Sequence, residues 1–123
     1  MNSMFNQCNS LITLNISSFN TSSAEDMDHM FSSCHSIKEL DISSFNTGNV
    51  VDMEKMFDNM FSLTTIYASE NFTVEKVTKG SNMFINDTNL VGGNNTVYDQ
   101  SHVDVSYAHI GSPSAPGYFK KRS

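Results

Sequence analysis

Residues 27–47 read MDHMFSSCHSIKELDISSFNT, and residues 1–21 are a close copy of this stretch. Its Met30-Phe31 pair recurs as Met4-Phe5 and as Met56-Phe57, so the sequence has a 26-residue period. Between residues 1–23 and 27–49, 12 of the 23 aligned positions are identical. Such self-similarity at a fixed period is the signature of a repeat protein, in which neighbouring repeats bury a shared core.

The spacing of hydrophobic residues changes in the middle of each repeat. Met53, Met56, Phe57 and Met60 fall at helical spacing, and this pattern predicts helices that begin near residues 24 and 50. The alternation in Leu40-Asp41-Ile42 is typical of a short strand. A strand and a helix in every repeat predict a right-handed α/β solenoid, with short parallel strands on one side and short helices on the other.

The repeat pattern weakens along the chain. We expect the solenoid to cover residues 1–91, with about three 26-residue repeats, the first of them truncated, and a degenerate fourth. Residues 92–119 combine turn-forming residues with spaced aromatics, which predicts an irregular C-terminal cap, and residues 120–123 are predicted to fray. Because Met1 falls inside a repeat, we expect the uncovered N-terminal end to self-associate or to fray over residues 1–8.

Composition argues against several classes of protein. A net charge of −6 and a pI near 4.9 argue against nucleic-acid binding, which needs a basic surface. The sequence has no run of about 18 apolar residues and no signal-peptide pattern, so we expect no membrane insertion by this segment. None of the four histidines has a nucleophile and an acid at a recognisable spacing, so we expect a protein that is not an enzyme and needs no cofactor.

Two cysteines occupy the same apolar position in adjacent repeats. Cys8 and Cys34 are separated by one repeat, and Met60 continues their column. Two arrangements fit this pattern: buried thiols, or a disulfide, since neighbouring strands lie about 4.8 Å apart, within the Cα range of a bridge. His35 is adjacent in sequence but no further ligands converge, so no metal site is predicted.

The run DMDHMFSSCHSIKELDISSFNTGNVVDMEKMF, residues 26–57, resembles the BspA-like leucine-rich repeats of bacterial surface proteins, in the variant also found in mycoplasma lipoproteins. Residues 90–119 are similar to the C-terminal unit of that family, through LVGGNNT, YD, YAHI and PGYF. The third repeat departs from the family pattern, because Met60 replaces the cysteine and residues 68–72 carry an insertion. The resemblance implies a leucine-rich-repeat-like solenoid.

The resemblance also implies a location and a role. Members of the family are extracellular or cell-surface proteins, and the resemblance implies a solenoid face that adheres to a host or matrix protein or to a glycan. Under this hypothesis the chain is a non-enzymatic interaction module. The alternative is a purely structural spacer or stalk that presents another domain.

Outward-facing strand positions are the predicted binding surface, because only they form a continuous and regularly spaced face. Tyr67 is the expected anchor, since an exposed tyrosine offers a large rigid contact area with a hydrogen-bonding tip. Acidic positions on the same face would favour a polar or basic ligand. The predicted binding residues are Thr13, Asn15, Glu39, Asp41, Thr65 and Tyr67.

Overall fold

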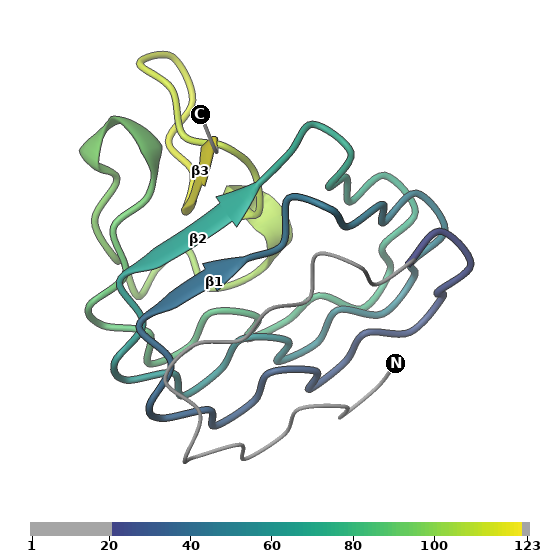
Figure 1. The fold of residues 1–123 in the computed structure, drawn as a ribbon, viewed down its shortest axis with the longest axis horizontal. Helices are drawn as coiled ribbons and strands as arrows, with labels where there is room; N and C mark the ends of the chain where they lie inside the picture. Colours follow the sequence, from purple (N-terminus) through teal and green to yellow (C-terminus); the bar gives the residue numbers. More distant parts are fainter. Residues whose placement is uncertain (1–20, 122–123) are drawn as a thin grey trace.

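A computed structural model describes residues 21–121. The elements in this range are the strands β1 (Glu39–Asp41), β2 (Thr65–Ala68) and β3 (Phe119–Lys121) and the 3-10 helices η1 (Gly93–Asn95) and η2 (Val105–Tyr107). Within the described range the strands form one parallel sheet in the order β1-β2-β3 (Figure 1). The same residues contain no helix with the length and hydropathy that a membrane span requires.

The strand predicted at Leu40-Asp41-Ile42 is observed as β1. It pairs with β2, one repeat further along the chain, with Leu40 opposite Ile66 and Asp41 opposite Tyr67. Leu40, Ile42 and Ile66 are fully buried, whereas Glu39 is exposed. The predicted strand register and the predicted alternation of inward and outward residues in β1 are therefore confirmed.

The prediction of helices is wrong for the described residues, in which there is no α-helix. In residues 27–33 every second backbone N–H donates instead to a carbonyl oxygen of the next repeat, with N···O distances of 2.8–3.0 Å. The donor–acceptor pairs are Met27–Asp52, His29–Glu54, Phe31–Met56 and Ser33–Asp58. Residues 53–59 bond to residues 79–85 in the same way, so successive segments lie side by side (Figure 1).

A turn that repeats every four residues explains why these segments read as helical. His29 and Ser33 have positive φ angles of 56° and 61°, and Lys55 and Asn59 repeat the pattern at 54° and 57°. The N–H groups of Met30 and Ser32, which do not reach the next repeat, donate to the carbonyl oxygens three residues back, those of Met27 and His29. A period of four residues buries nearly the same positions as a helix with 3.6 residues per turn, so spacing alone does not separate the two.

Threonine hydroxyls also join neighbouring repeats. Thr47 is buried, and its hydroxyl donates to the carbonyl oxygen of Thr73 at 2.8 Å while it accepts from the N–H of Thr73 at 2.7 Å. Thr21, one repeat earlier, makes the same two bonds to the backbone of Asn46. Each hydroxyl therefore satisfies one backbone donor and one acceptor of the next repeat.

The core contains a column of stacked phenyl rings. Phe31 stacks on Phe57 with centroids 5.6 Å apart, and Phe57 stacks on Phe84 at 5.5 Å. Tyr118 then packs edge-on against Phe84 at 4.9 Å. The ring of a C-terminal residue therefore closes the column that the repeats build.

The C-terminal segment replaces the next repeat at the sheet. Val91 still bonds to Thr64 through its backbone N–H, but the strand beside β2 is β3, from the end of the chain. Phe119, opposite Ile66, is fully buried. The prediction that the chain frays from residue 120 is therefore wrong for Lys120 and Lys121, which belong to β3.

Some predictions fall on residues outside the described range. The bonding of Cys8 and self-association through residues 1–8 concern residues 1–20. Cys34 itself is fully buried, as its apolar column predicts.

Asp87 occupies the position of Cys34 and Met60 in the third described segment. Its carboxylate is fully buried, and its Oδ1 accepts from the backbone N–H of Met60 at 2.9 Å. Burial raises the pKa of Asp87 well above its usual value, the bond from Met60 opposes this, and the charge of Asp58 adds to it. The acid is held where burial favours its neutral form.

We predict that Thr47→Val lowers the free energy of unfolding by about 2–3 kcal/mol, because both backbone groups of Thr73 lose their partner. Thr47→Ser keeps the hydroxyl and should lose less than half as much. Denaturant unfolding of both variants measures the difference. Equal losses would show that the hydroxyl contributes no more to stability than the methyl group of Thr47, and would contradict the prediction.

We also predict that Asp87→Asn stabilises the protein increasingly as the pH rises above about 4. Above the unfolded pKa of 3.8, the unfolded chain releases its proton while folded Asp87 retains it, so wild-type stability falls until the pH reaches the raised folded pKa. The asparagine keeps an oxygen for Met60 but does not titrate. The gap between the two unfolding free energies should widen by up to about 1.4 kcal/mol per pH unit; a constant gap would contradict the prediction.

Candidate binding surface

The outward face of the sheet carries one row of chemically different side chains. Asp41, Tyr67 and Lys120 lie at paired positions of β1, β2 and β3, and all three are partly exposed. Glu39 lies two residues before Asp41 on the same face and is exposed. An acid, an aromatic ring and a base thus lie side by side on a hydrogen-bonded sheet.

Lys120 is the residue of this row that the sequence reasoning missed. Its segment, Phe119–Lys121, has a single apolar residue followed by two lysines, which is too short for a strand pattern. The available signal was Tyr118-Phe119, an apolar pair after Pro116-Gly117 that had to be buried somewhere. The base changes the expected character of the surface from acidic to mixed.

Thr65 does not belong to the accessible surface. It was predicted to face outward as a binding residue, but the structure buries it to 9% exposure. It lies on β2, the central strand of the sheet, between β1 and β3. Its hydroxyl lies 3.4 Å from that of Thr64. Thr13 and Asn15, also predicted as binding residues, lie outside the described range.

Asp41 has a structural role that its exposed position conceals. Its Oδ1 accepts from the backbone N–H of Ser43 at 2.9 Å and from the Ser43 hydroxyl at 2.6 Å. These bonds fix the turn that follows β1, in the manner of other short aspartate-stabilised turns. The side chain is thus held in place before any partner arrives.

A hollow of about 320 Å³ adjoins this row, at the carboxyl ends of the strands. Its lining includes Ser43, which follows β1, Ser69, which follows β2, and Lys121 of β3. Glu70 brings an acid to the same hollow. Together with the row on the sheet, this hollow defines the strand-end surface, made of Glu39, Asp41, Tyr67, Glu70, Lys120 and Lys121.

Three carboxylates gather on a different part of the molecule, and the sequence reasoning, which predicted no metal, missed them. Asp26, Asp28 and Asp52 each offer an oxygen within 4.8 Å of the other two. The signal was that Asp26 and Asp52 hold the same repeat position, where they form a backbone bridge. Carboxylate oxygens are ligands for hard cations such as Ca²⁺, which takes about 6–8 oxygens.

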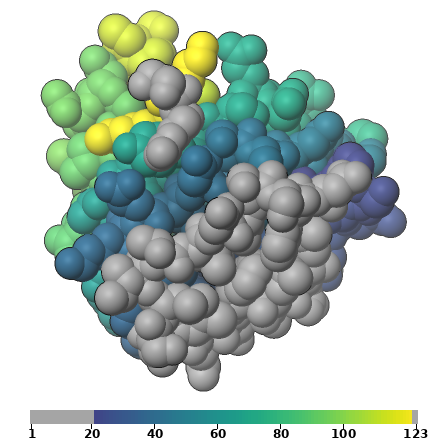
Figure 2. Space-filling view, in the orientation of Figure 1, coloured from purple at the N-terminus to yellow at the C-terminus, as the bar shows by residue number. Residues whose placement is uncertain are grey.

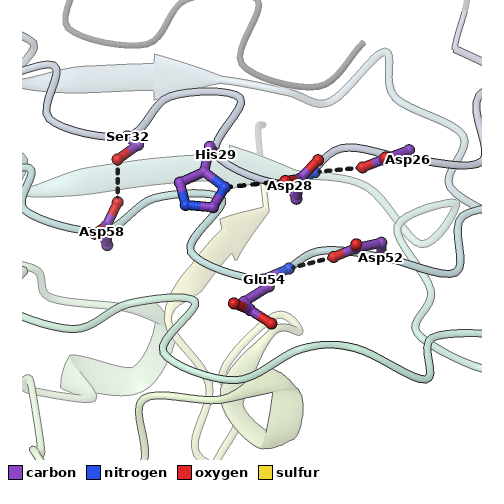
Figure 3. A network of polar contacts seen from close by, with 7 residues as sticks. All are labelled: Asp26, Asp28, His29, Ser32, Asp52, Glu54 and Asp58. Atoms are coloured by element: carbon purple, nitrogen blue, oxygen red, sulfur yellow. Dashed lines mark hydrogen bonds and ion pairs between the residues drawn. The ribbon is translucent and has the colours of Figure 1, made fainter.

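Two of these carboxylates, Asp26 and Asp52, are explained by the turns that they stabilise. Oδ1 of Asp26 accepts from the N–H of Asp28, and Oδ1 of Asp52 accepts from the N–H of Glu54, both at 3.0 Å (Figure 3). A hydrogen bond with Asp26 raises the pKa of Asp28, burial adds to this, and His29, 3.0 Å away, opposes it. We assign no ion to this cluster.

Comparison with known proteins identifies a family. A family model described as "Mycoplasma protein of unknown function, DUF285" matches residues 1–105. No curated protein and no solved structure matches the chain. The match includes β1 and β2 but ends before β3.

We predict that Asp41→Ala lowers the free energy of unfolding by about 1 kcal/mol, because it removes the acceptor that holds Ser43. Glu39→Ala, two residues away on the same face, should change stability by less than about 0.5 kcal/mol. Thermal unfolding of the two variants tests this. A loss at Glu39 as large as the loss at Asp41 would show that the turn bond is not what stabilises this edge.

Proposed function

The chain belongs to the DUF285 family of Mycoplasma proteins of unknown function, and from this premise we propose that it is a non-enzymatic interaction module. In this proposal it binds a host or matrix protein, or a glycan, through the strand-end surface. The row of Asp41, Tyr67 and Lys120 carries the proposal, because it presents three kinds of contact on one rigid face.

Rigidity supports this role. Binding costs less when the interacting side chains are already ordered. The sheet is hydrogen-bonded across β1, β2 and β3, and Asp41 is fixed by Ser43. A partner with both a basic and an acidic group would find a counter-charge for each, in Glu39 and in Lys120.

We further propose a wider context for the module. The repeated bonds between segments one repeat apart support a right-handed solenoid of the BspA-like leucine-rich-repeat type, with turns in place of its predicted helices. The residues quoted for that resemblance support a location at the cell surface or outside the cell. Both statements are proposals that rest on the repeat and on the resemblance.

A structural spacer is the second candidate function. Its support is the regularity of the contacts between segments, where Asp26, Asp52 and Lys79 hold equivalent bridged positions. A spacer needs this stacking but no specific surface. Binding measurements therefore separate the two functions.

The binding test uses the purified chain against immobilised extracellular-matrix proteins and a glycan array. The double variant Tyr67→Ala/Lys120→Ala should lose at least about tenfold in affinity, since aromatic and charged anchors dominate such interfaces. The matched control is Glu75→Ala, an exposed residue outside the sheet, which should bind like the wild type. If the wild-type chain binds no member of either panel, the spacer function is favoured.

Equal affinity of the double variant and the wild type would contradict the site assignment. Circular dichroism and thermal unfolding of each variant show that the fold is retained. A loss of affinity without a change in melting temperature is the expected result.

A further inference from the structure

A large hollow among the described residues lies in the C-terminal segment, away from the strand-end surface. It has a volume of about 780 Å³, within the range of small-molecule sites. The segment that forms it, green to yellow, stands at one end of the molecule (Figure 2). None of its lining residues belongs to the strand-end surface.

The wall of this hollow combines aromatic rings with uncharged hydrogen-bonding groups. Tyr98 and Tyr107 supply the rings, and Asn94, Asn95 and Gln100 supply amides. Asp99 is the one charged residue in the lining, which includes no lysine, arginine or histidine. The hollow therefore lacks the cations that a phosphate, sulfate or carboxylate ligand requires.

The amide-bearing side of the hollow is fixed to two later segments of the chain. Asn94 and Asn95 both have positive φ angles, of 55° and 58°. A Cβ atom on Gly93 would lie 2.5 Å from the carbonyl oxygen of Gly111, so the two backbones are in direct contact. The hydroxyl of Thr96 donates to the carbonyl oxygen of Gly93 at 2.8 Å and accepts from the backbone N–H of Gly117 at 3.3 Å.

The rings are braced from behind by Tyr118. Tyr98 stacks on Tyr118 with centroids 6.4 Å apart, and Tyr107 meets it edge-on at 5.1 Å. The buried Tyr118 hydroxyl accepts from the N–H of Asp99 at 3.0 Å and lies 2.9 Å from the carbonyl oxygen of His102. Burial raises the pKa of Tyr118 to about 12, so this hydroxyl keeps its proton. Both rings are held before a ligand binds.

We infer that this hollow is a binding site for a neutral saccharide. A pyranose ring presents an apolar C–H face that packs on an aromatic ring, and its hydroxyls both donate and accept hydrogen bonds. The amides of Asn94, Asn95 and Gln100 can do both in return, and the Asp99 carboxylate accepts two bonds. The inference rests on the proposed interaction function and adds a second, chemically defined site to it.

A quaternary ammonium group is the competing occupant, because two tyrosine rings and one carboxylate also suit a cation. An aromatic cage, however, uses open ring faces. One face of Tyr107 is covered by the ring of His102, with centroids 4.3 Å apart and planes 2° apart. The amides beside the rings would gain nothing from a group without hydrogen-bond donors, so the saccharide fits better.

The test uses saturation-transfer NMR on the full chain, with lactose, maltose, cellobiose and chitobiose as neutral probes. Sialyllactose and a heparin disaccharide serve as anionic probes, and choline serves as the cationic probe. We expect at least one neutral disaccharide to bind and the anionic and cationic probes not to bind. Choline binding without disaccharide binding, or no binding of any disaccharide, overturns the inference.

Variants locate the site. In the wild type, Oδ1 of Asp99 accepts a hydrogen bond from the N–H of Ser101 at 2.9 Å, and Asp99→Asn keeps an oxygen for this bond. Gln100→Ala removes an exposed side chain. Both variants should therefore retain the fold. The combined variant should bind the disaccharide at least about tenfold more weakly, since hydrogen bonds to charged groups are the stronger ones. Unchanged disaccharide affinity in this variant overturns the assignment to this hollow.

A variant at one site, tested for binding at the other, distinguishes the two sites. Tyr67→Ala, on the strand-end surface, should leave disaccharide affinity unchanged. Loss of disaccharide binding in Tyr67→Ala would place the saccharide at the strand-end surface and overturn the inference. If the chain binds a matrix protein but no disaccharide, this inference alone is refuted. If it binds a disaccharide but no matrix protein, the proposed strand-end site alone is refuted.

Discussion

Backbone hydrogen bonds between equivalent segments of successive repeats hold the other features of this structure in position. In residues 27–33 and 53–59, alternate N–H groups donate to the following repeat, while the groups between them bond two or three residues back within their own repeat. A buried N–H without a partner costs about 1–3 kcal/mol, so each segment depends on its neighbour to satisfy its own backbone. The register of these bonds brings like side chains into line, which is why Phe31, Phe57 and Phe84 stack.

This dependence makes the end of the repeats a physical problem, and the C-terminal segment solves it. Beyond residue 91 the chain leaves the repeat pattern, yet β3 pairs with β2 in the same parallel sense as β1 does. Tyr118 and Phe119 cover the end of the phenyl column, at 4.9 Å and 6.0 Å from Phe84. The glycines that accompany them are close-contact residues: a Cβ on Gly92 would overlap the carbonyl oxygen of Gly117. The candidate saccharide hollow is therefore part of the segment that terminates the core.

The parts of the fold that follow from side-chain alternation could be predicted from sequence, and the parts that follow from backbone bonding could not. Leu40, Asp41 and Tyr67 were correctly placed on β1 and β2, because the 26-residue offset fixes the register. Helices were predicted where four-residue turns occur, because both bury nearly the same positions. At the candidate binding surface, Lys120 was missed because β3 is defined by its partner β2. The burial of Thr65 has no signal in the 26-residue repeat.

The match between successive interfaces has a consequence at the level of the gene. The four backbone hydrogen bonds from residues 27–33 to residues 52–58 are repeated from residues 53–59 to residues 79–85, donor for donor. A whole repeat could therefore be gained or lost by unequal recombination without creating a new kind of interface, provided that the exchange preserves the register. The surface residues of a repeat would be copied with it, whereas the hollow, encoded once after the last repeat, would keep a single copy. Array length and ligand selectivity could thus evolve as separate traits.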